Sequence, residues 1–196
     1  SGGTVLCEGP TNGGNSSIDH NGSITITGGL LLSLGSSGMA NECLSNATTS
    51  TQCAFATNAN GSAGTTLAIK NSSGAVLCVF KTQKQFQHIV FSSPSLATGN
   101  TYQILTGVTG VGENICGYYP SNQYTGGTQL VSISQSSTIV GGSAGGPGGP
   151  GGMNARINRE KPKDLGKTIS RLLKYSGKSA YILIFLIVAT VIVTVA

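Results

Sequence analysis

Residues 64–80 read GTTLAIKNSSGAVLCVF, and this stretch decides the fold that the sequence predicts for the first half of the chain. Its two flanks, residues 65–71 and 75–80, are rich in the β-branched and apolar side chains that favour strands. Between the flanks, residues 71–74 (NSSG) supply the Asn, Ser and Gly that tight turns use. The stretch therefore predicts a β-hairpin, the clearest in the chain.

Further short strands are predicted on both sides of this hairpin, and turn-forming pairs such as Asn60-Gly61 and Ser93-Pro94 separate them. The additional predicted strands are residues 52–57, 87–91, 101–106 and 129–134. The region is also rich in Gly, Ser, Thr and Asn and low in charge, which disfavours a helical domain. Strands at this regular spacing are typical of a small antiparallel β sandwich or sheet, which we expect over residues 41–140.

The first forty residues contain an internal repeat. Residues 1–6 (SGGTVL) recur as residues 27–32 (TGGLLL), a spacing of 26. Residues 23–27 (SITIT) alternate apolar and polar side chains, which predicts a half-buried strand. Because short strands, glycine corners and a repeat of this length are typical of a β-solenoid, we expect residues 1–40 to be the last coils of a right-handed β-solenoid. A solenoid needs about three or more coils, so we do not expect Ser1 to be the natural start.

A segment of Gly and Pro divides the chain into two parts. Residues 141–152 read GGSAGGPGGPGG, which cannot bury apolar surface and predicts an exposed, disordered linker. The charge changes sign across this linker. Residues 1–152 carry three Lys against four Asp and Glu, a net charge of −1, whereas residues 153–196 carry eight Lys and Arg against two acids, a net charge of +6. We therefore expect two unlike modules that do not pack against each other.

Residues 153–179, which follow the linker, are basic and amphipathic. Asp164 is a suitable N-cap and Gly177 a suitable stop for a helix with one apolar face. The apolar residues at helical spacing are Leu165, Ile169, Leu172 and Leu173. The basic side chains expected at a membrane interface are Lys167, Arg171, Lys174 and Lys178. A helix of this kind lies in the interfacial region of a bilayer.

Residues 180–196 are seventeen residues without a charge, close to the lower limit for a transmembrane helix. Positive charge beside such a run favours a lipid bilayer as the partner and disfavours nucleic acid. No signal-peptide pattern is present and the chain ends within the apolar run, so we expect a piece of a longer protein with a truncated transmembrane helix. Because the basic residues precede the run, the positive-inside rule places the preceding part of the chain in the cytoplasm.

No pattern for catalysis, a cofactor or a metal is recognisable. The five cysteines lack zinc-site spacing. Cys43 and Cys53 bracket a short loop and could form a disulfide in an exported domain, whereas we expect Cys78 to be a buried free thiol. Asp19 and His20 are adjacent, but neighbouring strand residues point to opposite faces. We therefore expect that the chain is not an enzyme.

One stretch, residues 118–124 (YYPSNQY), has the composition of a sugar-binding surface. Sugar binding calls for an exposed aromatic platform flanked by hydrogen-bonding side chains. The candidate residues are Tyr118, Tyr119, Asn122, Gln123 and Tyr124. The alternative is a loop whose tyrosines cover the edge of the core, and the residues alone leave both interpretations open.

Several ordered segments of the first half resemble a known family. These segments are GGTVLCEGPTNGGN (2–15), IDHNGSITITGG (18–29), GSSGMA (35–40), GTTLAIKNSSG (64–74) and IVFSSPS (89–95). Over residues 1–140 the chain resembles the C-terminal part of bacterial surface proteins described as carbohydrate-binding domain-containing. The resemblance implies a non-catalytic extracellular or cell-surface protein in which β-helix coils precede a β-rich cap. It also implies glycans or cell-wall polysaccharide as partners.

The second half resembles a different family. Residues 160–193 (EKPKDLGKTISRLLKYSGKSAYILIFLIVATVIV) resemble the N-terminus of bacterial ABC-type exporters, in which a basic elbow helix precedes the first membrane helix. The phosphate-binding pattern GxxxxGK[ST] is absent from the chain.

These observations lead to one main hypothesis, a membrane-attached, non-catalytic β-rich surface protein that binds carbohydrate. One alternative is an N-terminal fragment of an ABC-type exporter fused to an unrelated β domain, and another is a structural adhesin or stalk without sugar specificity. The cell-surface location implied by the first resemblance conflicts with the positive-inside rule. This conflict favours a junction of two chains of different origin at residues 141–152.

Overall fold

The computed structural model describes residues 2–141, and these contain nine β-strands, one short 3₁₀ helix and no α-helix. The strands are β1 (Thr4–Glu8), β2 (Leu30–Gly35), β3 (Ala54–Gly61), β4 (Thr66–Asn71), β5 (Val76–Lys81), β6 (Phe86–Ser92), β7 (Thr101–Val111), β8 (Gln123–Ser134) and β9 (Ile139–Val140), and the 3₁₀ helix η1 is Ala40–Glu42. The predicted mainly β class is confirmed for these residues.

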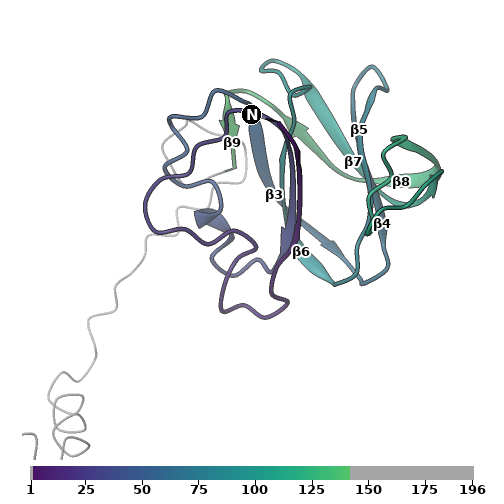
Figure 1. Ribbon diagram of the computed structural model, residues 1–196, viewed down its shortest axis with the longest axis horizontal. Coiled ribbons are helices and arrows are strands. Elements are labelled where there is room, and N and C mark those ends of the chain that lie inside the picture. The colour runs from purple at the N-terminus through teal and green to yellow at the C-terminus, as the bar shows by residue number, and fades with distance from the viewer. Residues whose placement is uncertain (1, 142–196) are drawn as a thin grey trace, which may run out of the picture. The chain divides into compact units, whose positions relative to one another are not determined.

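The strands form two sheets that share one hydrophobic core (Figure 1). One sheet has the strand order β1-β2-β6-β3-β9 and the other the order β5-β4-β7-β8. Phe55 and Phe91 of the five-stranded sheet lie in the same cluster as Ile69 and Ile104 of the four-stranded sheet, and all four are essentially inaccessible to water. Burial of such apolar surface is the main stabilising contribution to a fold of this size.

The hairpin predicted from residues 64–80 is present as β4 and β5, which pair antiparallel. The side chain of Asn71 organises the turn, because its Oδ1 accepts hydrogen bonds from the Ala75 N–H at 2.8 Å and from the Ser73 hydroxyl at 2.7 Å. Gly74 occupies the left-handed region with φ of 91°, which favours glycine. The Asn and Gly that the sequence indicated as turn residues are therefore the residues that close the hairpin.

The other strands predicted within residues 41–140 are present, and β7 and β8 differ most from the prediction because they are about twice as long. β7 continues to Val111 and β8 begins at Gln123, and the two strands remain paired as far as the Val111–Gln123 pair. These extensions contain several glycines, which are depleted in strands. Gly107 and Gly126 do have positive φ, yet pairing continues past both of them.

Residues 2–40 and 41–140 are not separate domains. β2 pairs with β6 in the five-stranded sheet, and Leu32 and Leu34 of β2 belong to the main core. The boundary expected at residue 40 therefore falls inside one compact unit.

The repeat at a spacing of 26 corresponds to a parallel strand pair. β1 and β2 pair with Thr4 opposite Leu30 and Leu6 opposite Leu32, so equivalent residues of the two copies lie side by side. Because strand residues alternate between faces, Leu6 points toward the main core whereas Val5 lies on the outer face of the sheet.

The outer face of the five-stranded sheet is covered by the two long connections before β2 and β3, the purple and blue loops in Figure 1. The strand predicted at residues 23–27 is wrong, because these residues have no ladder of backbone hydrogen bonds. Their alternation is nevertheless meaningful, since Ile24 and Ile26 contribute to the apolar cluster under these connections while Thr25 and Thr27 are exposed.

These two connections also contact each other, and the residues in contact are 24 to 26 positions apart in the sequence. The Ile26 carbonyl accepts hydrogen bonds from the N–H groups of Thr51 and Gln52, at 3.0 and 3.1 Å, and the Thr25 and Thr49 hydroxyls are hydrogen-bonded. Earlier in each connection, the Ser36 N–H donates to the Pro10 carbonyl at 3.0 Å. Residues 28–53 therefore stack on residues 2–27 along much of their length. No third layer occurs among the described residues, because β6 pairs antiparallel with the other edge of β2.

Several predictions fall outside the described residues. These are the linker after Gly141, the amphipathic helix within residues 153–179 and the transmembrane helix at residues 180–196. Within residues 2–141, no helix is long and apolar enough to cross a membrane.

Candidate functional site

The outer face of the four-stranded sheet carries a small apolar cluster on which two of the candidate tyrosines lie. Its buried members are Ala68, Val79, Leu105 and Val108. Tyr119 and Tyr124 pack against this cluster and remain half-buried. Tyr119 is fixed by its own backbone, because its N–H donates to the Val79 carbonyl of β5 at 3.0 Å.

A glycine in β7 determines how the Tyr119 ring lies. A Cβ atom added at Gly110 would lie 2.5 to 2.6 Å from three atoms of this ring, Cζ, Cε1 and Cε2. Nearly equal distances to three ring atoms mean that the ring lies flat over the Gly110 backbone. Tyr124 is paired with Gly110 across the β7–β8 ladder and therefore lies on the same face. One ring face of Tyr119 thus rests on the sheet and the other points away from it.

Polar groups flank this aromatic platform, which we define as Tyr119 and Tyr124 over Gly110. The Asn122 N–H donates to the Tyr119 carbonyl at 2.9 Å, in a tight turn where Asn122 has φ of 51°. The Oδ1 atom of Asn122 is buried and has no hydrogen-bond partner among the described residues. Gln123 is exposed and uncharged. Because neighbouring strand residues point to opposite faces, Gln123 points away from the face that carries Tyr124.

Few charged residues lie near the platform, although the exposed Lys81 is two positions after Val79 on β5 and therefore on the same face of the sheet. Glu113 is the one charged residue in residues 101–134, the stretch that contains β7, β8 and the connection between them. An aromatic surface with neutral polar groups beside it suits an uncharged polyhydroxylated ligand better than an ionic one.

Tyr118 does not belong to the platform. It packs against the main core and forms bridges with Phe80 and Ile115, so its ring points to the side of the chain opposite that of Tyr119. Burial, and secondarily the neighbouring Cys78, raises the pKa of the Tyr118 hydroxyl. The predicted group of five residues thus separates into Tyr119 and Tyr124 on the platform, Asn122 and Gln123 beside it in the chain, and Tyr118 at the core edge. Tyr118 therefore lies at the edge of the core, as the alternative interpretation expected, and sugar binding by the other four residues stays a prediction.

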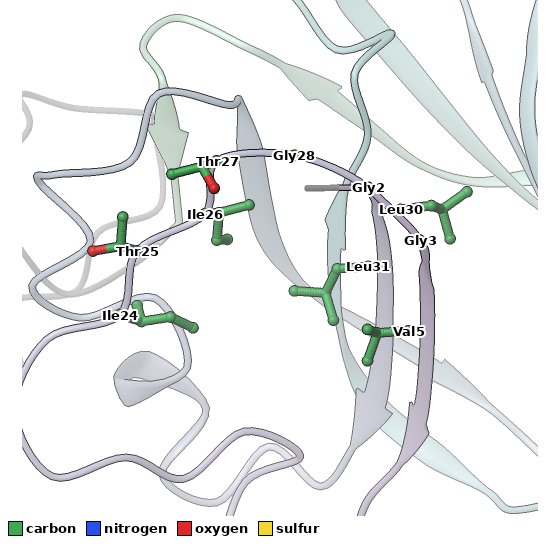
Figure 2. Close-up of a pocket in the computed structure, with 10 residues that line it drawn as sticks. All are labelled: Gly2, Gly3, Val5, Ile24, Thr25, Ile26, Thr27, Gly28, Leu30 and Leu31. Atoms are coloured by element: carbon green, nitrogen blue, oxygen red, sulfur yellow. The ribbon is translucent and has the colours of Figure 1, made fainter.

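A shallow pocket of about 300 Å³ lies elsewhere, at the open side of β1 (Figure 2). Val5 and Leu31 point toward Ile24 and Ile26 across this pocket, while Leu30 points to the other face of the sheet (Figure 2). No residue that lines the pocket is charged. The pocket contains no nucleophile–base pair and is an apolar surface.

The remaining sequence candidates are not brought together. Cys43 and Cys53 are free thiols on opposite faces of the five-stranded sheet, since Cys43 packs in the outer cluster and Cys53 against the main core. The Asp19 carboxylate accepts a hydrogen bond from Asn15 at 2.9 Å and has none from His20. Within residues 2–141, no three His, Cys, Asp or Glu residues are grouped as metal ligands would be. The membrane-interface residues Lys167, Arg171, Lys174 and Lys178 lie outside the described residues.

Comparisons with protein-family models, with curated proteins and with solved structures found no match for this chain.

Sequence reasoning missed Gly110, on which the platform depends. The signal was available, because a single glycine inside a strand pattern, here in TGVTGV, often marks a place where another group approaches closely. It was overlooked because strand β7 was predicted to end at residue 106.

Proposed function

We propose that this chain is a membrane-attached, non-catalytic β-rich surface protein that binds carbohydrate through the aromatic platform. The observation that carries the proposal is the Tyr119 ring, which lies flat on Gly110 with its other face turned away from the sheet. A rigid tyrosine held in this way can stack on the apolar face of a pyranose ring at little cost in conformational entropy.

The chemistry around the platform supports a neutral glycan as the ligand. The hydroxyl groups of Tyr119 and Tyr124 can each donate a hydrogen bond to a sugar hydroxyl and accept one from it. The Oδ1 atom of Asn122 is buried, so its side chain would have to turn outward before it could accept such a bond. The ligand that these groups recognise best is an uncharged oligosaccharide or cell-wall polysaccharide that lies along the β7–β8 face.

The test is a glycan array probed with the full chain, followed by affinity measurements on whichever glycan binds. Tyr119→Ala is expected to weaken binding about five-fold, because loss of an aromatic stack costs on the order of 1 kcal/mol. Tyr118→Phe is the matched control, since it changes a tyrosine of the same segment that packs against the core. Unchanged affinity in a folded Tyr119→Ala variant would contradict the proposal, and binding to no glycan would favour the structural adhesin or stalk.

The finer architecture belongs to the same proposal. The sequence predicted solenoid coils at residues 1–40, and we propose that the last two coils of a right-handed β-solenoid extend over residues 2–53, with the rest of the described chain as the β-rich cap. This interpretation is supported by the parallel β1–β2 register and by the hydrogen bonds between residues 25–26 and residues 49–52. Attachment to a membrane rests on the sequence of residues 153–196, in which an amphipathic basic segment precedes an uncharged apolar run.

A further inference from the structure

The backbone of β1 has one edge without a strand partner among the described residues. The Leu30 N–H donates to the Gly3 carbonyl at 2.8 Å, and the Gly9 N–H donates to the Leu34 carbonyl at 2.7 Å. In a parallel ladder the residues alternate, so the backbone groups of Thr4 and Leu6 face away from β2. The Lys84 ammonium covers the Glu8 carbonyl at 3.1 Å, at one end of this edge. The open hydrogen-bonding groups are therefore those of Thr4 and Leu6.

An apolar surface adjoins this open edge. Val5 is 58% exposed, the highest value among the large hydrophobic residues of the described chain. It borders the uncharged pocket of about 300 Å³, which Ile24 and Leu31, both half-buried, also line (Figure 2). An exposed aliphatic side chain beside an unpaired strand edge is a surface that a further strand would cover favourably.

The contact between residues 2–27 and residues 28–53 indicates what kind of strand would cover the open edge of β1. Each residue of β1 lies beside the equivalent residue of β2, 26 positions later, and Gly3 lies against Gly29. Ile26 makes its backbone contacts with residues 51 and 52, at almost the same spacing. On its other side, the first segment presents the edge of β1, the corner at Gly3 and the half-buried Ile24, and none of the described strands pairs with this edge, whereas Ile26 is buried in the outer cluster.

We propose that the edge of β1 and the adjoining pocket form a docking surface for a further coil of the same repeat. The coil would place a strand parallel to β1, with apolar side chains over Val5 and Ile24 and hydrogen bonds to the backbone of Thr4 and Leu6. The proposal continues an interface that already exists between residues 2–27 and residues 28–53. It rests on the coil arrangement proposed above and does not depend on sugar binding.

The test adds a coil to the full chain. A second copy of residues 2–27 is inserted directly before Gly2, so that its threonine equivalent to Thr4 lies 26 residues before Thr4, as Thr4 does before Leu30. Hydrogen exchange at the amides of Thr4 and Leu6 is then compared with that of the unaltered chain. We expect exchange to become more than about ten-fold slower, because both amides would gain a carbonyl partner. In the control chain, the added copy carries Val5→Asp and Ile24→Asp, which should remove the protection.

Three results would overturn the proposal. The first is unchanged exchange of the two amides after insertion, and the second is equal protection by the control copy. The third is protection of the same amides in the unaltered chain as its concentration rises, which would identify a second copy of the chain as the occupant. Glycan binding of the extended chain is measured in parallel. Loss or absence of glycan binding would contradict only the sugar-binding proposal, and unchanged amide exchange would contradict only the docking proposal.

Discussion

Replacement of Gly110 by alanine tests whether the Tyr119 ring lies on the β7 backbone. The added methyl group would lie 2.5 to 2.6 Å from three ring atoms, well inside van der Waals contact, so the ring or the strand must shift. Gly110 does not have a positive φ, and alanine is therefore compatible with its backbone conformation. Overpacking of this kind lowers the free energy of unfolding by about 1–3 kcal/mol.

The same substitution should be harmless once the ring is absent. In a Tyr119→Ala background, Gly110→Ala should change the free energy of unfolding little or raise it by about 0.5 kcal/mol, because glycine within a strand is unfavourable. The two substitutions should therefore be strongly non-additive, with a coupling energy of about 1–3 kcal/mol.

The assay is urea denaturation of the full chain and its three variants, followed by far-ultraviolet circular dichroism. The four free energies of unfolding give the coupling energy directly, provided that the slopes against urea concentration agree. Additive effects within about 0.5 kcal/mol would refute the stacked geometry and would remove the observation on which the sugar-binding proposal rests.

Two further predictions concern buried titratable groups. Burial lowers the pKa of His88 from its ordinary value of 6.5, so the unfolded chain binds a proton that the folded chain does not. The free energy of unfolding should therefore be greatest above pH 6.5 and fall as the pH drops below it, and a His88→Gln variant measured in the same buffers should lose most of that slope. Burial also raises the pKa of the Cys78 thiol to about 12, whereas Cys116 is exposed. A thiol-reactive disulfide reagent at pH 8 should therefore modify Cys116 in the folded chain and Cys78 only after denaturation, and rapid modification of Cys78 in the native state would contradict its burial.

Features encoded within a few neighbouring residues could be predicted from the sequence. The turn at residues 71–74 closes the β4–β5 hairpin through Asn71 and Gly74, both of which were visible in the NSSG stretch. The register of β1 on β2 could also be predicted from the repeat. The two copies of the repeat are 26 residues apart, and each residue of β1 pairs with the residue 26 positions later in β2.

Pairings between distant residues could not be predicted in this way. Nothing local in residues 86–92 indicates that β6 pairs with β2 on one side and β3 on the other, because alternation specifies which face is buried but not which strand is the neighbour. The platform could be predicted only in part for the same reason. Residues 118–124 provided its tyrosines, but the separation of Tyr118 from Tyr119 depends on β5 and on Gly110.

The position of β6 explains why the proposed docking surface exists on one side of the stack. β2 and β3 are both antiparallel to β6 and hence parallel to each other, and β6 occupies the place that a directly paired third parallel strand would take. Buried polar groups fix this arrangement. The Ser92 hydroxyl of β6 donates to the Cys53 carbonyl at 2.7 Å. The side-chain Nε2 of Gln52 donates to the Ser92 hydroxyl at 2.8 Å and to the Gly29 carbonyl at 2.7 Å.

Breaking this junction would leave buried polar groups without partners, at a cost of about 1–3 kcal/mol for each group. The edge of β2 that pairs with β6 is therefore closed to a further coil, whereas β1 has no comparable side-chain junction at Thr4 and Leu6 among the described residues. Growth of the repeat would consequently be directional, with new coils added against β1 and the sandwich closing the opposite end.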